Sequence, residues 1–144
     1  MTLSLEAARG LIAAVRGEGE ARGLSPLSAC VVDAGGFPIA FERADGVSPM
    51  RFAIAHGKAN GAVMMGLGSR AIAERAEAQP HFVQAMNALA GGALVPVPGG
   101  VLIRRDGAVI GALGVTGDSS DADEGCAVAA IEAVGLQADP GGRP

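Results

Sequence analysis

The sequence predicts an α+β fold in which a central antiparallel sheet of about five strands is flanked by helices. Its strand-like segments come in pairs joined by tight turns, at Gly35–Gly36 and at Asp106–Gly107, as in β-hairpins. They do not alternate singly with helices, as the strands of a parallel sheet do. The 144 residues are 49% hydrophobic, enough for one domain over 1–144 with its core at about 3–135.

The first predicted element is an amphipathic helix over residues 5–22. Ser4 is suited to its N-cap and Gly23 to the position after its C-terminus. Apolar residues recur there at helical spacing, with charged residues largely outside that stripe: Leu5, Ala8, Leu11, Ile12 and Val15.

A hairpin of two strands, 28–33 and 37–41, follows the first helix. Gly35 and Gly36 supply the positive φ angles of its turn. Because Pro38 has no N–H for the ladder, we expect it at a sheet edge or a strand start.

The middle of the chain is predicted to be helical. Ser48 as N-cap and Pro49 at the first helical position predict a helix from Met50 to about Met65. Two further helices are predicted over 69–78 and 81–89, separated by a proline.

The C-terminal part returns to strands. A short, weak strand is predicted over 94–97, and a clear hairpin over 101–105 and 108–116, with a type I′ turn between them. A last helix is predicted from about Asp121 to Val134. Residues 139–144 are expected to form a loose tail.

Charge and composition exclude some classes of function. The chain has 11 basic and 15 acidic residues, a net charge of −4, and neither Trp nor Tyr, so we expect no nucleic-acid partner. Its longest uncharged stretch is broken by glycines and prolines, so we expect no membrane span. The N-terminus lacks a basic segment, which favours a cytoplasmic location without a signal peptide. Cys30 and Cys126 are expected to be buried thiols, with a disulfide as the alternative.

Two residues of the 50–65 helix are the first candidates for chemistry. Lys58 is the only lysine and lies among small residues. It is either a desolvated amine that acts as a base or Schiff-base nucleophile, or a surface lysine. His56 is either a haem iron ligand or a polar residue of the helix surface, and the histidine spacing does not fit a zinc site.

Other candidates lie in loops and strand ends. Arg43 is suited to bind a carboxylate, and Asp45 and Glu124 to move protons. The turn between Thr116 and Asp123 is either an anion site or capped by its own acids. Two glycines within a strand indicate either packing or the close approach of a ligand: Gly111 and Gly114.

Six segments occur in the order typical of one family: Val31–Gly36, Arg43–Gly46, Ala55–Ala59, Pro98–Gly100, Ile110–Gly117 and Asp123–Ala127. Over roughly residues 3–135 the chain therefore resembles the GlcG/HbpS-like family, also found as the C-terminal domain of PduO. Ala44 and His56-Gly57 depart from the residues that are common in that family.

The resemblance implies a profilin-like fold, assembly as a homo-oligomer, and haem or a corrinoid as the bound group. It also maps shared family positions onto Lys58, Arg43, Asp45, Asp123 and Glu124. We therefore expect a small-ligand-binding oligomer that holds its ligand between the 50–65 helix and the 108–116 strand. The alternatives are an enzyme acting on a carbonyl or carboxylate metabolite with Lys58, Asp45 and Glu124 as acid–base groups, and a subunit that only assembles.

Overall fold

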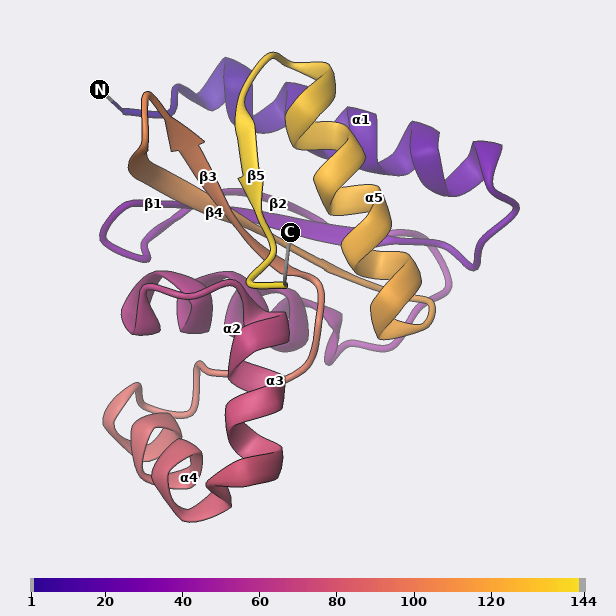
Figure 1. Cartoon of the computed structure of the whole chain (residues 1–144). Helices are drawn as coiled ribbons and strands as arrows, with labels where there is room; N and C mark the ends of the chain where they lie inside the picture. Colours follow the sequence, from indigo (N-terminus) through magenta and orange to yellow (C-terminus); the bar gives the residue numbers. More distant parts are fainter. Residues whose placement is uncertain (1, 143–144) are drawn as a thin grey trace.

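A computed structural model describes residues 2–142, which form one five-stranded antiparallel sheet with helices on both faces (Figure 1). The strand order is β2-β1-β4-β3-β5, so the predicted α+β class is confirmed. The elements are α1 (Leu5–Ala21), β1 (Ser28–Asp33), β2 (Pro38–Glu42), α2 (Arg51–Met65), α3 (Ser69–Ala78), α4 (Pro80–Leu89), β3 (Gly100–Arg105), β4 (Ala108–Thr116), α5 (Ser120–Ala133) and β5 (Gln137–Asp139).

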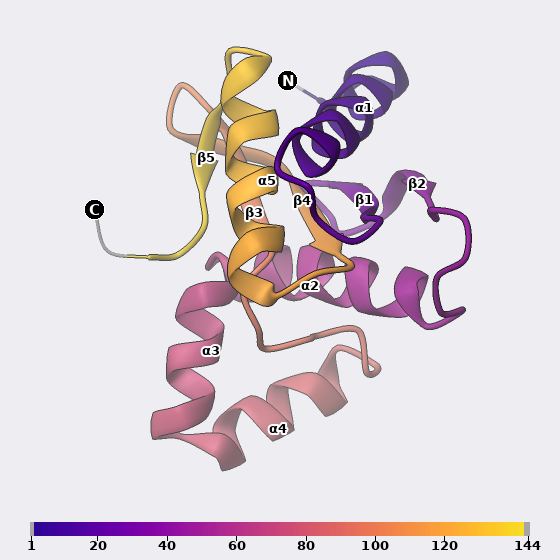
Figure 2. The ribbon, with the colours of Figure 1, turned by 90° about the vertical axis from the view of Figure 1, so that its right-hand side faces the viewer.

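The two faces of the sheet carry different helices. Helices α1 and α5 cover one face and α2 the other, and α3 and α4 extend beyond α2 (Figures 1 and 2). Side chains alternate along a strand, so Leu113 and Val115 of β4 join the core under α1 and α5, whereas Ala112 faces α2.

Both predicted hairpins are present, and local turn chemistry accounts for them. Of the two turn glycines, Gly36 has a positive φ of +87° but Gly35 does not, and the Asp33 carboxylate accepts hydrogen bonds from the N–H groups of Gly35 and Phe37. In the second hairpin Asp106 and Gly107 have φ angles of 51° and 80°, in keeping with the predicted type I′ turn. Pro38 is the first residue of the edge strand β2, as its missing N–H requires.

The starts of two helices differ from the expectation. Helix α2 begins at Arg51, because the Ser48 hydroxyl accepts the Met50 N–H at 3.1 Å and closes a turn before the helix. Helix α5 has Ser119 as its N-cap, whose hydroxyl accepts the Ala122 N–H at 3.1 Å. The turn before it is bound by its own acids, since Asp123 Oδ1 accepts the Asp118 N–H and Asp118 Oδ2 accepts the Ser119 N–H.

The fifth strand is a different segment from the predicted one. Residues 94–97 form no strand, since the Val95 N–H donates to the carbonyl oxygen of Gly57 in α2 at 3.0 Å. The strand at Gln137–Asp139 pairs with β3 instead, and Arg104 holds Asp139 in an ion pair at 2.9 Å.

The C-terminal tail is also more ordered than expected. The Arg70 N–H donates to the Pro140 carbonyl oxygen at 3.2 Å, and a Cβ at Gly68 would collide with the Pro140 backbone. The tail thus packs on the start of α3. The last two residues of the expected loose tail, 143 and 144, lie outside the described residues.

Candidate functional site

Helix α2 places its candidate residues on opposite faces. Successive residues of an α-helix are about 100° apart, so residues two positions apart point in very different directions. Ala55 and Ala59 face the sheet together with Lys58, whereas Phe52 and His56 lie on the outer side.

Lys58 lies in the core. Its side chain is 2% exposed, and Nζ donates to the Val115 carbonyl oxygen at 2.9 Å and to Asp123 Oδ2 at 3.2 Å. Asp123 is equally buried, and its Oδ1 accepts the backbone N–H of Asp118 at 3.0 Å. The amine therefore joins α2 to the end of β4 and the first turn of α5.

The electrostatics of this pair follow from its burial. Loss of hydration lowers the pKa of Lys58, and the Asp123 carboxylate partly reverses this by favouring the charged amine. A catalytic amine must touch its substrate, but this one contacts a carbonyl and a carboxylate within the protein. The geometry gives Lys58 a role in packing α2 against the sheet.

The space expected for a ligand between α2 and β4 is filled. A Cβ at Gly114 would collide with the Ala55 carbonyl oxygen of α2. Gly111 lies on the side of β4 that faces Leu3, where a Cβ would collide with the Val32 carbonyl oxygen of β1. Protein backbone makes the close approaches that these glycines predict. The ligand cavity expected between α2 and β4 is therefore replaced by direct packing. The Thr116 hydroxyl is likewise occupied, since it accepts from Arg51 Nη1 at 2.7 Å.

The remaining acid–base candidates do not meet Lys58. Arg43 and Asp45 are exposed in the loop after β2. Glu124 forms an ion pair with Arg70 at 2.9 Å. Within residues 2–142 no hydrogen bond or ion pair connects Lys58, Asp45 and Glu124.

His56, in contrast, has an open environment. Its ring stacks on Phe52, with centroids 5.5 Å apart and planes 4° apart, and Phe52 meets Phe41 edge-on at 4.9 Å. In the described part of the chain no hydrogen bond reaches either ring nitrogen of His56. The imidazole is therefore oriented by aromatic contacts while both nitrogens are left available as ligands.

His56 lines a groove of about 430 Å³. The floor is α2, one wall is the turn between β1 and β2, and the other is the end of α4 with the loop after it. Asn60 fixes the second wall, because its Nδ2 donates to the Ala93 carbonyl oxygen at 2.8 Å. The lining residues are Gly35, Gly36, Phe37, Pro38, His56, Asn60, Met64, Leu89, Ala90 and Ala93.

The groove is apolar and bordered by exposed side chains. Phe37 is 71% exposed, Leu89 81% and Met64 52%, and no charged residue lines the groove. Its volume lies in the range of about 300–1,000 Å³ usual for small-ligand sites, and a mainly apolar lining with a few polar groups is typical of them. A smaller hollow of about 160 Å³ adjoins it, since Met64, Leu89 and Ala90 line both.

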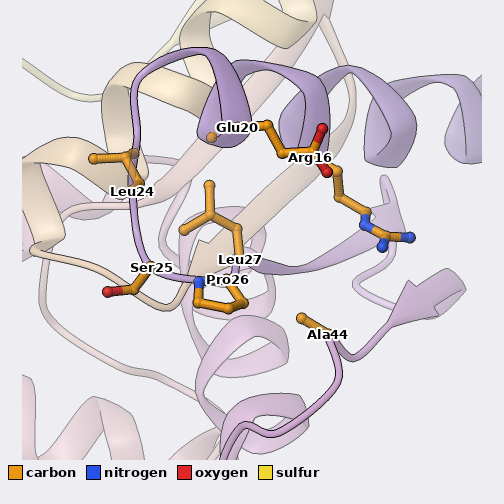
Figure 3. A pocket seen from close by; sticks show the side chains of 8 residues that line it. Arg16, Glu20, Leu24, Ser25, Pro26, Leu27 and Ala44 are labelled. Atoms are coloured by element: carbon orange, nitrogen blue, oxygen red, sulfur yellow. The ribbon is translucent and has the colours of Figure 1, made fainter.

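A second hollow lies between the end of α1 and the loop around Ala44 (Figure 3). It measures about 160 Å³, and its Arg16 guanidinium already binds Glu42 at 3.0 Å. Its size and its paired cation make it a weaker candidate than the α2 groove.

Other observations limit the site chemistry. Cys30 and Cys126 are buried free thiols, as expected. Within residues 2–142 no three His, Cys, Asp or Glu side chains gather to hold a metal ion. None of the helices described there is both long and apolar enough to cross a membrane.

Sequence reasoning named His56 but missed its groove. Phe52, Asn60 and Met64 recur with His56 every four residues along α2, and this period is visible in the sequence. The walls come from Phe37 and Leu89, which only the tertiary structure brings to the helix.

The chain is similar to one known protein family and to several solved structures. Residues 3–132 match the family model described as haem degrading protein HbpS-like. Among curated proteins there is no significant match.

Solved structures with the same fold are also similar in sequence. A PduOC–heme complex is 26% identical, aligns over 94% of this chain and 97% of that chain, and has a TM-score of 0.83. The crystal structure of HbpS is 28% identical over 93% and 91% of the two chains, with a TM-score of 0.81. The ORFY protein of Klebsiella pneumoniae is 26% identical over 92% and 90%, with a TM-score of 0.82.

Proposed function

Because the chain belongs to the HbpS-like family of haem degrading proteins, we propose that it binds haem on the outer face of α2, with His56 as the iron ligand. The observation that carries the proposal is an imidazole in an apolar groove that has no hydrogen-bond partner among residues 2–142. The similarity to a PduOC–heme complex supports the same class of ligand.

The residues of the groove fit this group. A histidine nitrogen is a common axial ligand of haem iron, and an apolar lining suits a flat aromatic ring. Phe52 holds the His56 ring in one plane, so little side-chain freedom is lost on binding. Asn60 keeps the groove wall in place through Ala93 and does not compete for the ligand.

A corrinoid is the second ligand that we propose to test, because it too is a large flat ring whose metal accepts a histidine nitrogen. The proposal includes self-association, supported by the exposed apolar residues around the groove. The free thiols fit a reducing compartment such as the cytoplasm.

Titration with haemin tests the proposal. We expect a saturable shift of the Soret band for the unaltered protein, and an affinity about tenfold or more lower for His56→Ala, equivalent to roughly 1.4 kcal/mol or more. His81→Ala is the matched control, since His81 is exposed on α4 and does not line the groove. Equal affinities for His56→Ala and the unaltered protein would refute His56 as the ligand.

A further inference from the structure

We propose that Met64, Met65 and Met86 bind one soft monovalent cation of the copper(I) class through their thioether sulfurs. The three side chains line a small hollow between the end of α2 and α4, and α4 lies beyond α2, away from the sheet (Figure 2). The hollow adjoins the proposed haem groove, but the site uses neither haem nor His56. The two proposals can therefore be tested separately.

The first argument is the distribution of the methionines. The chain has five methionines, and three of them line one hollow of about 160 Å³. Met64 and Met65 are the last two residues of α2, and Met86 lies in α4. Because α3 separates these helices in the sequence, the tertiary structure and not neighbouring positions brings the three side chains together.

The second argument is the set of donor atoms. Leu89, Ala90 and Leu94 complete the lining, so within residues 2–142 its side chains offer a metal ion thioether sulfurs and no oxygen or nitrogen. Magnesium and calcium take oxygen ligands, and zinc takes thiolate, imidazole or carboxylate. Thioethers are soft, polarizable donors that select copper(I). The lining therefore favours this class of cation.

The third argument is the size and accessibility of the hollow. Its volume of about 160 Å³ is below the range of about 300–1,000 Å³ usual for organic ligands, and it is well above the roughly 30 Å³ of one water molecule. Met64 is 52% exposed, whereas Met65 and Met86 are partly buried against the small core around Val83. An ion can enter past Met64 and reach the two less exposed sulfurs. Since the methionine side chain is unbranched and flexible, the three sulfurs can adjust to one ion.

The fourth argument concerns the competing ligands and the charge. Cys30 and Cys126 are fully buried in the two cores that flank the sheet, so neither thiol reaches the hollow. The formal net charge of −4 favours the approach of a cation. A thioether carries no proton to be displaced, so its affinity for the ion should not depend on pH. Thiolate or imidazole binding weakens as these groups become protonated, and this difference identifies the ligand type.

Titration with silver(I), a redox-inert analogue of copper(I), followed by native mass spectrometry tests the inference. We expect one ion per chain, and an affinity lower by about tenfold or more for Met65→Leu and for Met86→Leu, each measured alone. Leucine keeps the apolar lining at nearly the same volume, so both variants should fold, which circular dichroism checks. Copper(I) supplied from a chromogenic chelator should give the same order of affinities.

The matched control is Met50→Leu, since Met50 is 60% exposed before the start of α2 and does not line the hollow. It should bind silver(I) like the unaltered protein, and so should His56→Ala. The affinity should be equal at about pH 5.5 and about pH 7.5. No saturable binding, or unchanged affinity in both Met65→Leu and Met86→Leu, would overturn the site. An affinity that falls on acidification, or that is lost in His56→Ala, would assign the ion to other ligands and overturn it as well.

Discussion

Lys58 and His56 are two residues apart on α2, and the helix turns one into the core and the other toward solvent. The Lys58 amine is 2% exposed and bound to Val115 and Asp123. The His56 ring contacts Phe52, and neither nitrogen is bound within the described residues. One helix thus carries a polar group that packs it against the sheet on one face and, on the other, an imidazole that has no hydrogen bond within the described residues.

This difference teaches how a reactive residue type should be interpreted. A lone lysine among glycines and alanines resembles a catalytic amine, yet the small neighbours let α2 approach the sheet and enclose the amine. Lys58 and His56 differ in whether the side chain is already bound within the protein, and the residue type alone does not reveal this. Substitutions at the buried face of α2 should therefore act on folding, and those at its outer face on ligand binding.

The largest effect is expected for Lys58→Met. It leaves the Asp123 carboxylate buried without its partner, which costs about 3–5 kcal/mol of unfolding free energy. Urea denaturation followed by circular dichroism measures the loss. Adding Asp123→Asn, which removes the charge and keeps an acceptor for the Asp118 N–H, should recover part of it. A single variant as stable as the unaltered protein would show that the pair is dispensable.

Cys30 provides a pH-dependent probe of the core beneath α2. Burial raises the pKa of its thiol from 9.0 to about 12. Above pH 9 the unfolded chain therefore releases a proton that the folded chain retains. The contribution of the thiol to the unfolding free energy is complete below pH 9. It falls by roughly 1.4 kcal/mol per pH unit between pH 9 and about pH 12.

The control for this prediction is Cys30→Ala, measured over the same pH range. The lowered pKa of Lys58 acts with the opposite sign, because the unfolded chain then binds more protons than the folded one. The difference between the two proteins isolates the thiol. If the unfolding free energies of the unaltered protein and of Cys30→Ala fell in parallel above pH 9, the assignment to Cys30 would be contradicted.

Gly114→Ala tests how closely α2 packs on the sheet. Its Cβ would collide with the Ala55 carbonyl oxygen, and overpacking of this kind costs about 1–3 kcal/mol. Gly10→Ala is the matched control, since a Cβ there meets no atom within 4 Å and lies in helix α1. We expect it to stabilise the protein by roughly 0.5–1 kcal/mol. Thermal unfolding should show shifts of opposite sign for these two variants.

Much of the fold follows from local sequence signals. The two hairpins and the helix over Ser69–Ala78 follow from turn residues, caps and apolar spacing that act within a few residues. The apolar character of residues 94–97 predicts a strand, but the Val95 N–H donates to the carbonyl oxygen of Gly57 in α2. Strand β5 has no comparable signal, and pairing with β3 and the ion pair of Asp139 with Arg104 account for it.

The candidate site was predictable in a more limited way. Sequence identified His56 as a ligand candidate and Lys58 as exceptional, but not which of them faces solvent. That outcome depends on where Asp123 and Val115 lie relative to α2, and both are more than fifty residues further along the chain. The groove walls at Phe37 and Leu89 are likewise products of tertiary structure.

The smallest effect on stability is expected for His56→Ala. This variant gives the most direct comparison with Lys58→Met. The ring leaves no buried polar group unpaired, so unfolding free energy should change by no more than about 0.5–1 kcal/mol, mainly through the lost stacking on Phe52. Haem affinity should nevertheless fall, which separates ligand binding from folding. Lys58→Met should show the opposite pattern. Its unfolding free energy falls, while the molecules that remain folded keep the groove. If His56→Ala instead unfolded the protein as readily as Lys58→Met does, the two faces of α2 would not have the separate roles assigned to them.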